Sequence, residues 1–143
     1  MAYNFLEDIE VYFVNLSATN NIRTNLGATL VSNTNLFLGV EPATPTDSIT
    51  IIPGPGLSPD VRHRYAEYPN VQVRVRTSTY QKGYKVSQAV IKDLHNNDRI
   101  GSDLPMKAFA IQTQPGFLKW DESEYAVWVC NFDFMSSKKY TVS

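Results

Sequence analysis

The chain has 143 residues, of which 43% are hydrophobic, so it suits a globular protein and predicts one domain over residues 1–143. Thirteen basic and 14 acidic residues give a formal net charge of −1, which gives no reason to expect a nucleic-acid binder or a membrane-surface protein. One cysteine excludes an intrachain disulfide, the acidic start argues against a signal peptide, and no apolar run approaches the ~20 residues of a membrane span, so we expect folding in a reducing cytoplasm.

The N-terminal region predicts a short amphipathic helix. Asn4 and Glu7 have the spacing of a capping box, in which two side chains satisfy early helix N–H groups. Apolar residues then recur at helical spacing: Phe5, Ile9, Tyr12 and Leu16. We expect the Ser/Thr/Asn-rich stretch 17–25 to end this helix, and short strands to follow near Ala28–Val31 and Leu36–Leu38.

Residues 39–69 predict a long proline-rich arm. Six of the eight prolines of the chain lie in this stretch, and proline removes the N–H that a helix interior or a central strand requires. Within it, the β-branched run SITII at 48–52 predicts a strand. This strand, together with Tyr65 and Tyr68, favours an ordered arm over a flexible linker.

The stretch YPNVQVRVRTSTYQKGYKVSQAVIKDL, residues 68–94, predicts a strand that leads directly into a helix. Valines alternate with polar residues at 71–76, and the pair Ser78 and Gln81 then has capping-box spacing. Gly83 lies in the early turns, where glycine costs about 1 kcal/mol against alanine, so we expect another group to pack closely on it. Asn96 and Asn97 suit a left-handed cap at the end of the helix.

The last third of the chain predicts two further strands, at 106–114 and 124–135, with a turn at Pro115–Gly116. One face of the final strand is apolar throughout, whereas the other is apolar only at its beginning, so we expect half of this strand to be covered on both sides. The order of elements predicts an α+β fold: a mostly antiparallel sheet with two helices packed on it and a long proline-rich arm.

The residues that could carry chemistry do not form a recognisable site. His63 and His95 lie far apart, and Cys130 has no partner at metal-ligand spacing and alternates with apolar residues, which predicts a core position. The acids at 121–124 cluster in a turn, and GPG at 54–56 lacks the pattern of a phosphate-binding loop. We therefore expect no enzymatic activity, no metal and no cofactor.

Basic and aromatic residues give the candidate contact residues. Arg74 and Arg76 point the same way on the predicted strand, roughly 7 Å apart, where they could contact phosphates, meet acids of a neighbouring subunit, or lie on a solvated face. The arm adds four further candidates: Arg62, Arg64, Tyr65 and Tyr68. Aromatic residues reach 12% of the chain, and such a surplus is often used in subunit contacts.

Three sequence segments carry a resemblance to a known family: PNVQVRVRT, the helix of type YxxGYxxSxAVxxxL, and AIQTQPGFLKWDESEYAVWVCNFDF. Residues 48–135 resemble the tail-terminator, tail-completion or "minor capsid" proteins of long-tailed bacteriophages, and PGPG at 53–56 is similar to a Pro-Gly turn of that family. The N-terminal 45 residues have no match of this kind.

The resemblance implies a virion protein of the head-proximal end of the tail. Such a protein assembles with itself as a ring, usually a hexamer, on the last ring of tail-tube protein, halts tube growth and presents a surface to the head-side connector. Arg74 and Arg76 would then face a neighbouring subunit or the lumen through which DNA passes. A head-completion or neck protein on the portal side, and a host-directed binding module that forms no ring, remain the alternatives.

Overall fold

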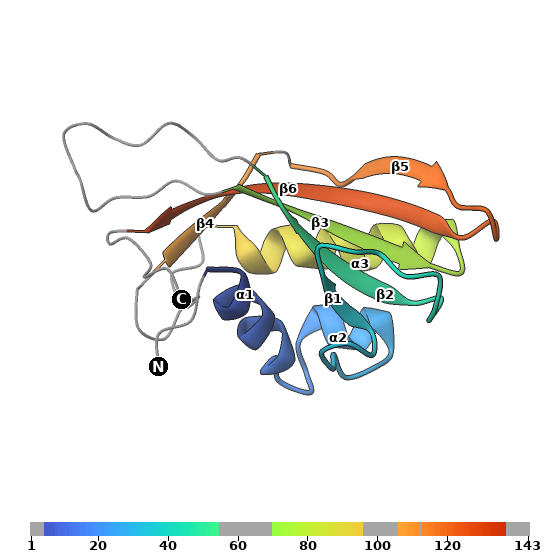
Figure 1. The fold of residues 1–143 in the computed structure, drawn as a ribbon, viewed down its shortest axis with the longest axis horizontal. Helices are drawn as coiled ribbons and strands as arrows, with labels where there is room; N and C mark the ends of the chain where they lie inside the picture. The colour runs from blue at the N-terminus through green and yellow to red at the C-terminus, as the bar shows by residue number, and fades with distance from the viewer. Residues whose placement is uncertain (1–4, 55–69, 96–105, 112, 137–143) are drawn as a thin grey trace.

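The computed structural model describes residues 5–54, 70–95, 106–111 and 113–136. Three helices and six strands lie within these ranges (Figure 1). In chain order they are α1 (Phe5–Val14), α2 (Asn21–Leu26), β1 (Leu36–Leu38), β2 (Ser48–Pro53), β3 (Asn70–Thr77), α3 (Tyr80–Leu94), β4 (Met106–Ala110), β5 (Gly116–Trp120) and β6 (Ala126–Ser136).

The strands form one twisted sheet in the order β1-β2-β3-β6-β4, with β5 also paired to β6. β1 and β2 are parallel, and every other pair is antiparallel. β4 pairs with the second half of β6 and β5 with its first half, so the two short strands follow one another along the same edge. The predicted α+β class with a mostly antiparallel sheet is confirmed.

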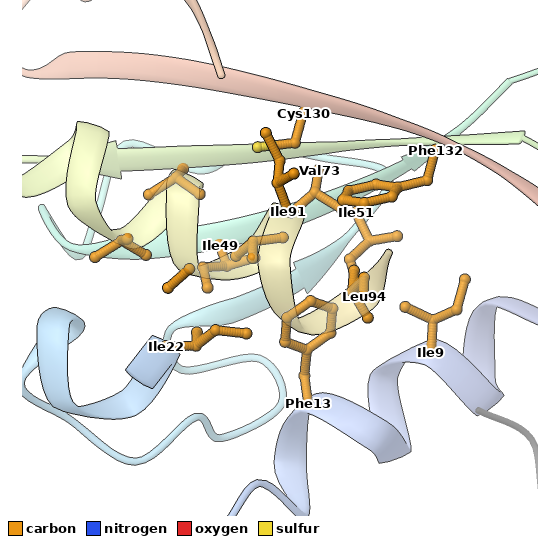
Figure 2. Packing of buried hydrophobic residues seen from close by; sticks show 14 of the residues in the cluster. Ile9, Phe13, Ile22, Ile49, Ile51, Val73, Ile91, Leu94, Cys130 and Phe132 are labelled. Atoms are coloured by element: carbon orange, nitrogen blue, oxygen red, sulfur yellow. The ribbon is translucent and has the colours of Figure 1, made fainter. Parts of the chain in front are cut away.

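All three helices lie against one face of the sheet and enclose the hydrophobic core (Figure 1). Figure 2 shows side chains of every helix meeting those of the sheet. The helices contribute Ile9, Phe13, Ile22, Ile91 and Leu94, and the strands contribute Ile49, Ile51, Val73, Cys130 and Phe132. Each of these ten is at most 5% exposed. Cys130 is therefore the core residue that the sequence predicted.

Helix α2 was not predicted, because it lies in the polar stretch that was expected only to end α1. Residues on either side cap the helix: Asn20 accepts a hydrogen bond from the Ile22 N–H at 2.8 Å, and Gly27 ends the helix in the left-handed region at φ 81°. Ile22 and Leu26, four residues apart, are buried. A six-residue helix offers only this one apolar pair to a search for periodicity.

The strand predicted at Ala28–Val31 is wrong. The side chain of Asn35 accepts a hydrogen bond from the Val31 N–H and donates one to the Thr29 carbonyl, so these backbone groups bind a side chain rather than a neighbouring strand. At the other end of the chain, the predicted strand at 106–114 ends at Ala110, and the predicted turn at Pro115–Gly116 leads into β5, which was not predicted.

The predicted helix after β3 is confirmed as α3, with its N-cap one residue later than expected. Thr79, rather than Ser78, accepts a hydrogen bond from the Lys82 N–H. The close packing expected at Gly83 is confirmed, because a Cβ placed there would lie 2.5 Å from Cδ1 of Trp128. His95 is the C-cap in an extended conformation, and the two asparagines proposed as the cap lie outside the described residues.

Candidate functional site

The face of the sheet opposite the helices carries a polar strip on β2 and β3. Ser48 pairs with Arg76 and Thr50 pairs with Arg74 in the antiparallel register, so these four side chains share one face. Val127 of β6 is the partner of Arg76 on its other side and is completely buried. The first part of this face is therefore covered, as the sequence predicted for the final strand.

The cover is the segment 39–47, the first part of the predicted arm, which connects β1 to β2. Its Glu41 carboxylate lies between the two arginines, with Oε1 3.4 Å from Nη1 of Arg76 and Oε2 3.8 Å from Nη1 of Arg74. Arg76 also donates hydrogen bonds to the carbonyl oxygens of Pro45, at 2.6 Å, and Thr46, at 3.4 Å. The guanidinium thus holds this segment on the sheet.

A second ion pair anchors the same segment at its end. The carboxylate of Asp47 accepts a hydrogen bond from Nζ of Lys82 in the first turn of α3, and its other oxygen accepts one from the Ser78 N–H. Segment 39–47 is therefore tied by charge to both β3 and α3. The arm begins as an ordered part of the protomer.

The structure places the two arginine candidates differently. The side chain of Arg76 is 4% exposed and its partners belong to its own chain, whereas the side chain of Arg74 is 29% exposed and its Nε donates to the side chain of Gln72 at 2.8 Å. A contact of either arginine with a neighbouring subunit or a lumen stays a prediction. The remaining candidates, Arg62, Arg64, Tyr65 and Tyr68, lie outside the described residues.

An exposed aromatic cluster, formed by β5 and the start of α3, was not among the contact residues predicted from the sequence. We call the exposed rings of Tyr80, Phe117 and Trp120, with the underlying Trp128 and the neighbouring Tyr84, the aromatic face. Tyr80 packs against Trp128 with centroids 4.7 Å apart and the ring planes inclined at 58°, and Phe117 contacts both Tyr80 and Trp120 at centroid distances of 5.2 and 5.3 Å. Three separate elements supply these rings, so no single stretch of sequence shows the cluster.

Several of the groups considered for chemistry have structural partners, whereas His63 and residues 55 and 56 of the GPG stretch lie outside the described residues. Asp121 accepts hydrogen bonds from the N–H groups of Ser123 and Tyr125, which closes the turn before β6. Nδ1 of His95 accepts a hydrogen bond from the Ala110 N–H of β4. Burial raises the pKa of the Cys130 thiol to about 12.

The described part of the chain holds no group of three or more His, Cys, Asp or Glu side chains placed to bind a metal ion. No helix within the described ranges is long and apolar enough to cross a bilayer.

Comparison with known proteins gives the chain its context. A search of curated proteins found no match. Among solved structures, a chain from the virion of a native gene transfer agent particle matches with a TM-score of 0.61 and 12% sequence identity, covering 94% of this chain and 98% of that one. At this identity the match shows a shared fold.

The family is shown by a sequence comparison that includes most of the chain. The model of the bacteriophage tail terminator protein family matches residues 7–135, which includes the N-terminal region for which the sequence alone offered no resemblance. The described helices α2 and α3 and all strands except the last residue of β6 lie inside this match. The chain belongs to the bacteriophage tail terminator protein family and is a structural protein of the virion.

Proposed function

We propose that copies of this chain close into a ring, a hexamer by analogy with the family, and that this ring caps the tail tube. The ring stops polymerisation of the tube protein and offers its free side to the head-side connector, and its role is structural rather than catalytic. The observation that carries this proposal is the family match over residues 7–135. The similarity in fold to a chain of a virion particle supports it.

The surface chemistry of the protomer supports self-assembly. Exposed apolar side chains that lie together, rather than singly, mark contact surfaces in soluble proteins. The aromatic face leaves Tyr80 46% exposed and Trp120 52% exposed, although both rings belong to one packed cluster. A ring requires two different surfaces on each subunit, because its contacts are heterologous and close on themselves.

The predicted contact residues enter the proposal with different roles. Arg74, which keeps exposed atoms beside Glu41, faces a neighbouring subunit or the DNA-conducting lumen. Arg76 holds segment 39–47 on the sheet, and this keeps Glu41 beside Arg74. Arg62, Arg64, Tyr65 and Tyr68 of the arm are proposed to reach a neighbouring subunit or the tube protein.

Two measurements test the proposal. Light scattering and negative-stain imaging of the chain mixed with its tail-tube protein should show a closed ring, and monomers alone in this mixture would contradict it. A deletion of this chain should yield tails of uncontrolled, excessive length. Free tails of normal length would instead indicate a head-completion or neck protein on the portal side.

A further inference from the structure

The aromatic face is built as a shallow binding surface. Trp128 is 3% exposed and forms its floor, and Tyr80, Phe117 and Trp120 stand around it with 37% to 52% of their surface exposed. Beside these rings lies a hollow of about 480 Å³ lined by Tyr80, Gln81, Tyr84, Lys85 and Trp128. Its walls are mainly apolar, and large rigid rings bury much area at a low entropic cost when a partner covers them.

The rim of this surface carries one basic group. Lys119 lies next to Trp120 on β5, but it pairs with Val127 and so belongs to the opposite face of the sheet. Lys85 lines the hollow, and its side chain is exposed. In the part of the chain that the structure describes, no carboxylate pairs with Lys85. A partner suited to this surface therefore presents apolar side chains with negative charge beside them.

The outer face of α1 has that chemistry. Val11 and Val14 are each 37% exposed and lie three residues apart, while Ile9 and Phe13 on the opposite side are buried in the core. Glu10 lies four residues before Val14, so its carboxylate flanks the same stripe. The helix has no basic residue in its last turn. Two valines and a glutamate thus form an apolar stripe with an acidic border.

The two surfaces lie at opposite ends of α3 (Figure 1). The aromatic face includes Tyr80, the first residue of α3, whereas α1 is joined to its other end by a hydrogen bond of 2.6 Å from the Tyr12 hydroxyl to Asp93. Thirteen residues of helix separate these points, which corresponds to roughly 20 Å. One protomer cannot bring its own surfaces together, but two copies can.

We infer that the outer face of α1 in one copy packs on the aromatic face of the next copy, with Glu10 beside Lys85. This inference rests on the proposed ring and names its subunit contact. The two patches differ, so the contact is heterologous and can close into a ring. Apolar packing of the valines on the rings supplies the contact area, and the glutamate–lysine pair fixes its orientation.

Site-specific cross-linking tests the contact. The double variant Val14→Cys/Gln81→Cys places one thiol on each surface, and the native Cys130 is buried, with its pKa raised to about 12, so it does not compete. Treatment with a short bis-maleimide in the presence of tail-tube protein should give a ladder of linked subunits. Each single variant should give no ladder, because a heterologous contact never brings two identical positions together.

A matched control separates contact from random collision. Val31 is 48% exposed and belongs to neither surface, so Val31→Cys/Gln81→Cys should give no ladder. A ladder of equal strength in this control would overturn the inference. A ring seen by light scattering without a ladder from the first pair would also overturn the inference and leave the proposed function standing. Absence of any ring would count against the proposed function itself.

Charge reversal gives an independent readout. Glu10→Lys and Lys85→Glu should each weaken assembly about tenfold or more, and the double reversal should recover most of the loss. Circular dichroism should show all three variants folded, because Lys85 is exposed and Glu10 is only half-buried. Two single losses that simply add in the double variant would contradict the pairing and point to another partner, such as the tube protein, on these surfaces.

Discussion

Nη2 of Arg76 on β3 donates a hydrogen bond of 2.6 Å to the carbonyl oxygen of Pro45, 31 residues earlier in the chain. The same guanidinium meets the Glu41 carboxylate at 3.4 Å, and its side chain is only 4% exposed. A charge that is almost completely withdrawn from water needs such partners, because its desolvation costs several kcal/mol. The connection between β1 and β2 supplies these partners, and their bonds to Arg76 hold the connection in place.

Replacing Arg76 should therefore destabilise the protomer far more than replacing its neighbour on the same face. We expect Arg76→Ala to lower the free energy of unfolding by about 3 kcal/mol, since it leaves the Glu41 carboxylate largely buried beside a more distant charge. Arg74→Ala should cost about 1 kcal/mol or less, because that pair is 3.8 Å apart and partly exposed. Urea unfolding of the two variants gives the comparison. Equal losses of unfolding free energy would contradict a special role of Arg76 in holding segment 39–47.

Asp93 joins all three helices and should be a second determinant of stability. Its carboxylate accepts hydrogen bonds from the Tyr12 hydroxyl of α1, at 2.6 Å, and from the Asn20 side chain that caps α2, at 3.1 Å. Asp93→Ala should cost about 2 to 3 kcal/mol, because hydrogen bonds to a charged group contribute more than neutral ones.

Tyr12→Phe provides the matched control for Asp93. It removes only the hydroxyl and should cost about 1 to 2 kcal/mol while the ring stays in place. Thermal unfolding followed by circular dichroism measures both variants. A loss for Tyr12→Phe as large as that for Asp93→Ala would show that the carboxylate contributes through the tyrosine alone.

Gly83 should resist the substitution that helix propensity favours. Alanine gains about 1 kcal/mol over glycine in an open helix interior. At this position the added Cβ would lie 2.5 Å from Trp128 and 2.8 Å from Oγ1 of Thr77, and overpacking of this kind typically costs 1 to 3 kcal/mol. We expect Gly83→Ala to be destabilising and to shift the tryptophan fluorescence. Gln81→Ala, at an exposed position two residues earlier, should be neutral or slightly stabilising.

The sequence predicted the elements whose patterns are local. Strands β2 and β3 were recognised from β-branched residues and alternation, and α3 from its caps and apolar face. β5 was missed because GFLKW does not alternate: a register shift between Phe117 and Lys119 interrupts the period of two. The strand expected at Ala28–Val31 does not form, because the side chain of Asn35 makes hydrogen bonds with its backbone groups.

The candidate site was harder to predict than the fold, since its contacts join distant parts of the chain. The pair of arginines could be recognised in the sequence, but Glu41 lies 33 and 35 residues before them. No local sequence pattern indicates that the Glu41 carboxylate contacts Arg76 rather than solvent. The aromatic face combines α3, β5 and β6, so its rings are separated by up to 48 residues along the chain. Only the fold brings these groups together.

Cys130 should be inert in the native protein and should make stability fall at high pH. Burial raises its pKa from 9.0 to about 12, so the folded state keeps the proton while the unfolded chain loses it above about pH 9. The contribution of this thiol to stability is therefore complete below pH 9 and is lost as the pH rises toward 12, by about 1.4 kcal/mol per unit. Tyrosine and lysine side chains also titrate in this range, so the measurement is the difference between the native chain and Cys130→Val. We expect the unfolding free energy of the native chain to fall more steeply above pH 9 than that of the variant, and parallel curves of free energy against pH would refute this.

The same burial should keep the Cys130 thiol unreactive in the folded chain. At pH 8 a thiol reagent should leave the native chain unmodified and should label Gln81→Cys at its exposed position. The reagent should modify Cys130 only after the chain is unfolded in urea.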